Sequence, residues 1–267
     1  MNDLGIEPED FRKVFPSSEE EGYLLIKISR AHAKNFAYDL RKAIRRCYIT
    51  DERLIECADR ENVCKAEVVK SKLPDRGSTM AGEFGEILTS LYQICHEYPT
   101  KILDPWKLRL KGDRTKPAPH SDVVQFVLPR WPEPSSDDRI ICSEVKTKST
   151  KSSSKPIVEA IRDSKKDSER RLPKTIAWLE EKSLDPGIDS VSRKQIKRFG
   201  ENMIEYPEVN REFNAVAVIC SSLVDDEIVD IDAALDEGTK LIIISIPDLK
   251  KNYEAVYEAV LKASDEC

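Results

Sequence analysis

The sequence predicts a mixed α/β fold: one sheet with helices on both faces, and a small α/β unit on its N-terminal side. Two continuous apolar runs, FNAVAVICSS (residues 213–222) and KLIIISI (residues 240–246), are typical of strands buried on both faces. From Met80 the patterns follow the order helix, three strands, helices, strand, acidic helical crossover, strand and helix. This order indicates a mixed sheet between two helical layers.

The beginning of the chain predicts the smaller unit. Its expected elements are a strand over GYLLIKIS (residues 22–29) and amphipathic helices through Arg45 and from Asp51 to about Lys70. Turn-forming residues in LPDRGS (residues 73–78) mark a boundary. We therefore expect an N-terminal α/β unit over residues 1–76, suited to docking a partner, and a larger domain over residues 77–267.

The larger domain begins with an amphipathic helix, MAGEFGEILTSLYQICHEY, in which Phe84, Ile87 and Leu91 recur at helical spacing. Three strands are expected next, over WKLRLK (residues 106–111), SDVVQFVL (residues 121–128) and RIICSEVKTK (residues 139–148). Helices are then expected from Ile157 to about Lys182, from the break at LDPG to Tyr206, and from Asp248 onward.

Composition and charge restrict the classes of function. No apolar run approaches the roughly 20 residues that span a bilayer, and the acidic N-terminus has no signal-type apolar segment. We therefore expect an intracellular, cytoplasmic protein with no membrane partner. The seven cysteines stand singly, which argues against disulfides and a zinc site. The net charge of −6 argues against unaided, sequence-blind nucleic-acid binding, although residues 144–171 carry nine Lys or Arg against five acids.

The most informative motif lies on the third strand of the larger domain. Alternate side chains of a strand share one face, so Glu144, Lys146 and Lys148 point the same way. An acid followed two residues later by Lys occurs four times, but only Glu144 and Lys146 lie on a predicted central strand. The other pairs lie in helical patterns and are expected to be solvated surface pairs: Asp163 with Lys165, Glu180 with Lys182, and Asp248 with Lys250.

Further carboxylates accompany this motif. Asp122 opens the preceding strand, and Glu86 lies on the helix before the sheet. Mg²⁺ (or Mn²⁺) is held by few carboxylates together with substrate phosphate, so Asp122 and Glu144 are the expected ligands, with Glu86 as a direct or outer one. Such an ion would polarise a phosphoryl oxygen and activate water. Lys146 would then orient the water and neutralise developing charge.

Several residues have two interpretations. Lys148, Lys151 and Lys155 are expected to hold the backbone of a nucleic acid. For Glu144 and Lys146, the alternative is a strand edge that carries surface charges in a sheet whose function lies elsewhere. Glu83 either shares the site of Glu86 or caps the helix. His120 either supports the site or is a polar strand-entry residue, which we favour. Trp106 and Trp131 are expected to be core or rim aromatics and not base-stacking platforms.

Three stretches resemble a known family: RGSTMAGEFGEIL (residues 76–88), LRLKGDRTKPAPHSDVV (residues 108–124) and CSEVKTK (residues 142–148). Their order and spacing are similar to those of the HamA family of Hachiman anti-phage defence systems, within the PD-(D/E)xK nuclease superfamily. The resemblance is specific from Arg76 to Lys155 and looser toward the C-terminus. It implies a restriction-endonuclease-like core.

The resemblance also implies roles for individual residues. The metal-binding acids fall on Asp122 and Glu144, the catalytic lysine on Lys146 and the helical acid on Glu86. One departure concerns Pro119, which is not adjacent to Asp122 as it is in the superfamily signature, and this bears on the local loop geometry.

The family further implies a function and a partner. A HamA protein is expected to be a Mg²⁺-dependent deoxyribonuclease without sequence preference, restrained on intact DNA by a HamB-type helicase. The acidic leader and the acidic segment 225–237 would discourage stray DNA binding and could dock on a basic partner. Two alternatives remain open: an inactive nuclease fold that serves as a scaffold, and a restriction-type endonuclease. The absence of a DNA-reading motif disfavours the second.

Overall fold

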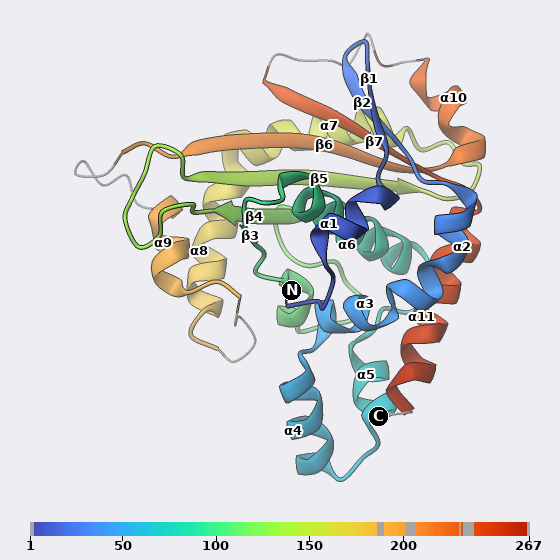
Figure 1. Cartoon of the computed structure of the whole chain (residues 1–267), viewed down its shortest axis with the longest axis vertical. Helices are drawn as coiled ribbons and strands as arrows, with labels where there is room; N and C mark the ends of the chain where they lie inside the picture. The colour runs from blue at the N-terminus through green and yellow to red at the C-terminus, as the bar shows by residue number, and fades with distance from the viewer. Residues whose placement is uncertain (1–2, 186–189, 201–206, 230, 232–237, 266–267) are drawn as a thin grey trace.

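The computed structural model describes residues 3–185, 190–200, 207–229, 231 and 238–265, which form a seven-stranded mixed sheet with helices on both faces (Figure 1). The predicted fold class is confirmed. The strands are β1 (Ser17–Glu20), β2 (Tyr23–Lys27), β3 (Ile102–Leu103), β4 (Val123–Val127), β5 (Arg139–Lys148), β6 (Asn210–Cys220) and β7 (Thr239–Ile246). Their order in the sheet is β1-β2-β7-β6-β5-β4-β3.

The helical elements connect and cover these strands. Before β3 they are α1 (Pro8–Phe11), η1 (Arg12–Val14), α2 (Arg30–Asp39), α3 (Arg41–Tyr48), α4 (Asp51–Glu61), α5 (Lys65–Lys72) and α6 (Ser78–Glu97). After β3 they are η2 (Lys107–Leu110), α7 (Pro156–Lys166), η3 (Asp167–Arg171), α8 (Leu172–Lys182), α9 (Arg193–Gly200), η4 (Ser221–Leu223), α10 (Val224–Ile228) and α11 (Leu249–Asp265). No helix in the described part of the chain combines the length and the apolar character needed to cross a membrane.

Pairing between β4 and β5 positions the predicted site. β5, β6, β7 and β2 are parallel neighbours, whereas β4 runs antiparallel to β5. Val123 pairs with Ser143, so the residue before β4 lies beside the residue after Ser143. The register therefore brings Asp122 next to Glu144.

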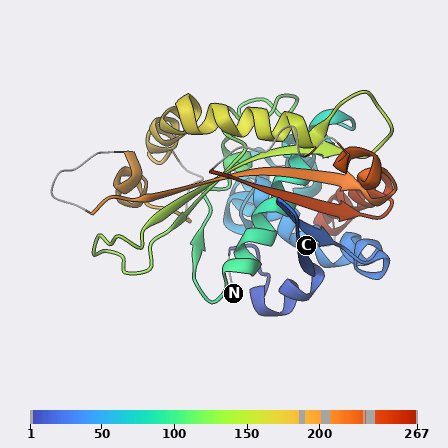
Figure 2. The same cartoon turned by 90° about the horizontal axis from the view of Figure 1, so that it is seen from above.

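Two helices cover opposite faces of the central strands. The alternation of β5 and β6 directs Val145, Val216 and Val218 into a core with α6 and the N-terminal helices. The opposite face of β6, with Ala215 and Ala217, packs against α7. Figure 2 shows α7 in yellow along one face and α6 on the other. Because Glu144 pairs with Ala215, its side chain lies on the α7 face.

The N-terminal segment contributes to the same sheet. β2 pairs in parallel with β7, and the helices α2, α3 and α5 pack against α11. Figure 1 shows α3, α4, α5 and α11 gathered below the sheet. One core cluster contains apolar residues of both segments, including Ile26, Phe36, Phe84 and Val256. The domain boundary after residue 76 stays a prediction. If the chain divides there, the two units share one sheet, because β2 of the first unit pairs with β7 of the second.

One predicted strand is wrong. WKLRLK forms the short helical turn η2, because Trp106 takes a left-handed backbone conformation with φ of 48°. The side chain of Asp104 accepts a hydrogen bond from the backbone N–H of Trp106 at 2.8 Å and fixes this turn. The turn directs Lys107 inward, where its side chain is buried.

The other predicted elements agree with the structure where it describes them. The β5 bounds match the predicted strand, and α7, η3 and α8 together fill the predicted helical region. The predicted helix to Tyr206 is described as α9 up to Gly200, and residues 201–206 lie outside the described residues. The acidic segment 225–237 is described only through α10, residue 229 and residue 231.

Candidate active site

Two carboxylates meet where β4 begins beside β5. Asp122 stands directly before β4, and its Oδ2 accepts a hydrogen bond from the backbone N–H of Val145 at 2.9 Å. Glu144, on β5, is only 2% exposed. The two negative charges are close enough that Glu144 contributes to a raised pKa of Asp122. The beginning of β4 and the neighbouring part of β5 therefore place two hard oxygen donors side by side.

Lys146 completes the strand motif. Its Nζ lies 2.5 Å from Oε1 of Glu144 and 3.1 Å from Oδ2 of Asp163, a residue of α7. Burial lowers the pKa of Lys146, but the charge of Glu144 and the hydrogen bonds to Glu144 and Asp163 outweigh it and raise the pKa. Lys146 is therefore an ammonium group at neutral pH, suited to donating hydrogen bonds and not to removing a proton.

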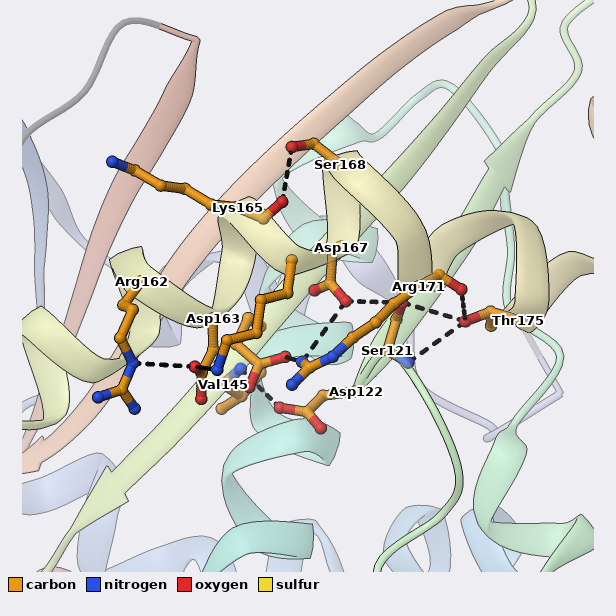
Figure 3. Close-up of polar contacts among 12 residues, drawn as sticks. Ser121, Asp122, Val145, Arg162, Asp163, Lys165, Asp167, Ser168, Arg171 and Thr175 are labelled. Carbon is orange, nitrogen blue, oxygen red and sulfur yellow. Dashed lines mark hydrogen bonds and ion pairs between the residues drawn. The ribbon is translucent and has the colours of Figure 1, made fainter.

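The turn η3, which follows α7, adds two further charged residues to the site. Nη1 of Arg171, at the end of η3, donates to Oε2 of Glu144 at 2.9 Å and lies 3.7 Å from Oδ1 of Asp167. Asp167 is fully buried and accepts a hydrogen bond from the Ser121 hydroxyl at 2.9 Å. Figure 3 shows Arg171 and Asp167 reaching down from the helix toward Asp122, while Lys165 points away.

Sequence reasoning missed these helical residues. Asp163 was expected to form a solvated pair with Lys165, which is wrong, because Asp163 is buried and bridges Lys146 and Lys166. Asp167 and Arg171 follow it at intervals of four residues, which places all three on one helical face. That spacing was the available signal, but it is equally common on solvated helices.

Glu86 lies on α6, and α6 covers the opposite face of the sheet from Glu144. Its neighbour in the structure is Asp122, across a small cavity of about 20 Å³ that Lys107 also lines. Burial and the charge of Asp122 raise the pKa of Glu86 well above its ordinary value. Burial lowers the pKa of Lys107, although the negative charges of Glu86 and Asp122 act in the opposite direction. The structure thus joins Glu86 to Asp122 but not directly to Glu144.

The donor set fits a divalent cation with two protein carboxylates. Among the described residues, no group of three or more His, Cys, Asp or Glu is arranged to hold a metal ion. Mg²⁺ commonly takes only one or two carboxylates, with water and substrate phosphate filling its remaining positions. Asp122 and Glu144 supply that number, and a cation between them would relieve their mutual repulsion. Glu86, which faces Asp122 across the small cavity, would then influence this ligand without itself contacting the ion.

The three lysines assigned to nucleic-acid binding differ in their placement. Lys148 is 6% exposed, and its Nζ contacts Glu227 at 2.6 Å and the carbonyls of Ser152 and Ser154. As placed, its ammonium fastens the loop after β5 to α10, and a role of Lys148 in binding nucleic acid stays a prediction. Lys151 and Lys155 are exposed on that loop, and their contact with a nucleic acid stays a prediction.

The residues with two interpretations also have defined places. Glu83 is 1% exposed and binds the Tyr48 hydroxyl at 2.6 Å together with the ammonium of Lys111, so it stabilises the core and does not cap the helix. His120 is an exposed residue of the strand-entry loop with φ of 66°. Trp106 is buried in the core beside α6, and Trp131 packs against a separate apolar cluster formed by β4, β5, α8 and α9.

The match to a family model decides the identity of the chain. The HamA family model matches residues 9–260 of the 267 residues. The chain belongs to the HamA family. As a HamA protein, it is a Hachiman-associated defence protein, and the family implies association with a Hachiman partner. A comparison with curated proteins found no match.

The electrostatics of this HamA site predict a pH dependence of stability. Burial and Glu144 raise the pKa of Asp122 from 3.8 to about 7, so the folded protein favours the protonated form. Stability contributed by protonation of Asp122 is present below pH 4 and is lost as the pH rises to about 7. In urea denaturation without metal, Asp122→Asn should therefore stabilise the protein at pH 8 by roughly 1–3 kcal/mol and have little effect at pH 4.

A matched substitution tests this explanation. Hydrogen bonds from Thr115 lower the pKa of Asp113 to about 2, which is the opposite direction. Asp113→Asn should not stabilise the protein at pH 8. Equal effects of Asp113→Asn and Asp122→Asn at that pH would contradict the electrostatic account.

Proposed function

We propose that this HamA-family protein is the metal-dependent, DNA-cleaving subunit of a Hachiman defence complex. The observation that carries the proposal is the convergence of Asp122, Glu144 and Lys146 on two adjacent strands, with Nζ of Lys146 2.5 Å from Glu144. Two carboxylates and an ammonium at one point suit phosphodiester hydrolysis, in which negative charge develops on a phosphoryl group.

Individual residues would have distinct roles in this hydrolysis. Asp122 and Glu144 would hold Mg²⁺ (or Mn²⁺), with Glu86 acting on Asp122. When bound, the ion supplies Lewis-acid polarisation of a phosphoryl oxygen and lowers the pKa of water. Lys146 would donate hydrogen bonds that orient the attacking water. The water oxygen bonds to phosphorus, the bond from phosphorus to the leaving oxygen breaks, and the water proton passes to solvent or to the leaving oxygen.

The substrate would approach along a groove beside this site. A depression of about 650 Å³ lies between the end of β5 and the beginning of α6. Its lining includes Lys146, Ser149, Thr150, Lys250, Tyr253 and Glu254, whereas Asp122 and Glu144 do not line it. Hydroxyl and ammonium groups of this kind contact phosphates and sugars without reading sequence. The groove supports DNA cleavage without sequence preference.

Control by a HamB-type helicase is part of the proposal. A nuclease without site recognition needs restraint from outside its active site, and the net charge of −6 limits unaided DNA binding. We expect the acidic leader, with exposed Glu19, Glu20 and Glu21, to take part in docking on the partner. Charge-neutralising substitutions there test this better than deletion, because deletion of residues 1–75 would remove β2 from the shared sheet.

The deciding experiment incubates the purified chain with supercoiled plasmid and with single-stranded DNA, in Mg²⁺ and in EDTA, with and without the co-purified partner. Mg²⁺-dependent cleavage of many sites by the chain alone, suppressed on intact plasmid by the partner, is the expected result. Cleavage at one defined sequence would support the restriction-type alternative. A chain that binds the partner but cuts nothing in any condition would support the scaffold alternative.

The exposed lysines predict a salt-dependent contribution to DNA affinity. Replacing Lys151 and Lys155 together by Gln should weaken DNA binding and reduce the slope of log affinity against log salt by about 1–2, since each phosphate contact releases a counterion. Fluorescence anisotropy at several salt concentrations measures this slope. Lys165→Gln is the control, because Lys165 points away from the site (Figure 3). If Lys165→Gln changed the slope by the same amount, the loop that carries Lys151 and Lys155 would not be part of the DNA-binding surface.

A further inference from the structure

Arg171 occupies an unusual position in the backbone. It ends η3, a π-helical turn over Asp167–Arg171 that joins α7 to α8. Single π turns within α-helices are uncommon and often occur at functional sites, because they redirect a side chain. Here the turn directs a guanidinium into the carboxylate cluster, while the side chain keeps 28% of its surface exposed.

Both oxygens of Glu144 are already engaged by cations. Lys146 contacts Oε1 and Arg171 contacts Oε2. A metal ion that binds Glu144 competes with both of these cations for the same negative charge and repels them. Lys146 is also held by Asp163 at 3.1 Å, whereas the other carboxylate near Arg171, Asp167, is 3.7 Å away. The two side chains are similarly exposed, at 28% and 26%, so Arg171 differs from Lys146 in having the weaker second contact.

The surroundings of Arg171 are built to hold the turn while the side chain changes partner. The Thr175 hydroxyl contacts the Arg171 carbonyl at 3.1 Å and the Ser121 hydroxyl at 3.1 Å, which ties the turn to the residue before Asp122. Oδ2 of the fully buried Asp167 has no hydrogen-bond partner among the described residues. An acceptor thus remains beside the guanidinium when it leaves Glu144.

We propose that Arg171 binds the scissile phosphate of the substrate after a divalent cation has taken its place on Glu144. This rests on the proposed nuclease function and adds a residue to it. A planar guanidinium with several donors suits a phosphate better than the point charge of Lys does. In the metal-free protein, the contact with Glu144 keeps Arg171 beside the site and makes it a competitor of the metal.

The test measures metal binding and cleavage separately on the full chain. Variants Arg171→Ala and Arg171→Lys are compared with Arg170→Ala, a control at the adjacent, exposed position of the same turn. Without DNA, Arg171→Ala should bind Mn²⁺ about fivefold more tightly, as expected from removal of a partly exposed ion pair that competes for Glu144. Isothermal titration calorimetry or Mn²⁺ electron paramagnetic resonance measures this affinity.

In cleavage assays, Arg171→Ala should lower kcat on the order of 10²-fold at saturating Mg²⁺, because one donor to the developing charge is lost. Added guanidinium ion should restore part of the rate, Arg171→Lys should retain part of it, and Arg170→Ala should match the parent chain. Circular dichroism melting of each variant establishes that the fold is retained.

Each outcome has a definite meaning. Unchanged or weaker Mn²⁺ binding by Arg171→Ala would refute the claim that Arg171 competes with the metal ion for Glu144. An unchanged kcat would refute the claim that Arg171 binds the scissile phosphate. If the parent chain cuts no DNA, the proposed nuclease function fails and phosphate binding by Arg171 fails with it. The Mn²⁺ titration still decides whether Arg171 competes for Glu144, so the two failures are distinguishable.

Discussion

Replacing Glu144 with Gln is expected to reduce Mg²⁺-dependent DNA cleavage on the order of 10³-fold, one of the two largest effects anticipated for this protein. The substitution keeps the shape of the side chain but removes the charge that the metal requires. It also removes the counter-ion of Lys146 and Arg171, whose contacts with Glu144 measure 2.5 and 2.9 Å. Cleavage of plasmid at matched Mg²⁺ measures the effect.

The control for this experiment is another acid two residues before a lysine. Glu180 and Lys182 repeat the motif on α8, where Glu180 pairs with Arg193 away from the carboxylate cluster. Glu180→Gln should cleave like the parent chain, and both variants should still co-purify with the partner. Full cleavage by Glu144→Gln would refute the assignment of this residue as a metal ligand.

The second large effect concerns folding. Glu83→Ala is expected to destabilise the protein by roughly 3–5 kcal/mol, because it leaves the ammonium of Lys111 buried without its counter-ion. Glu83 also accepts a hydrogen bond from Tyr48, whose hydroxyl lies 2.7 Å from that of Tyr257. One carboxylate therefore connects α6, α3 and α11. Urea denaturation of the metal-free protein measures the loss.

Two further variants separate charge from packing at this position. Replacing Lys111 by Met in the Glu83→Ala background should restore part of the stability, because no unpaired charge remains buried. Glu86→Ala, one helical turn away, should cost much less stability while lowering cleavage. If Glu83→Ala folded as stably as the parent chain, the buried ion pair would have no structural importance.

The part of the site that follows strand periodicity could be predicted from sequence. Alternation along β5 places Glu144 and Lys146 on one face, and consecutive strands place Asp122 beside them. Lys148 also lies on the predicted face, and its ammonium contacts Glu227. No local pattern indicates that contact, since Glu227 is 79 residues away in the chain.

The remaining site residues depend on tertiary packing. Asp163, Asp167 and Arg171 belong to the site because the crossover helix lies over β5, and their spacing alone does not distinguish a buried face from a solvated one. Lys107 was missed because the WKLRLK pattern suggests a strand, whereas the left-handed Trp106 begins a turn. The left-handed conformation of Trp106 thus accounts for the buried position of Lys107.

The pairing of β2 with β7 has a consequence for synthesis of the chain. Residues 24–27 pair with residues 242–245, so the sheet is completed only after β7 has left the ribosome. The cluster of Asp122, Glu144 and Arg171 is synthesised earlier, but its supporting sheet then lacks two of its parallel strands. Interrupted translation leaves the apolar faces of β2 and β6 uncovered, and such a fragment is a substrate for chaperones and proteases. Assembly of the carboxylate cluster on a complete sheet therefore requires synthesis of the chain through β7.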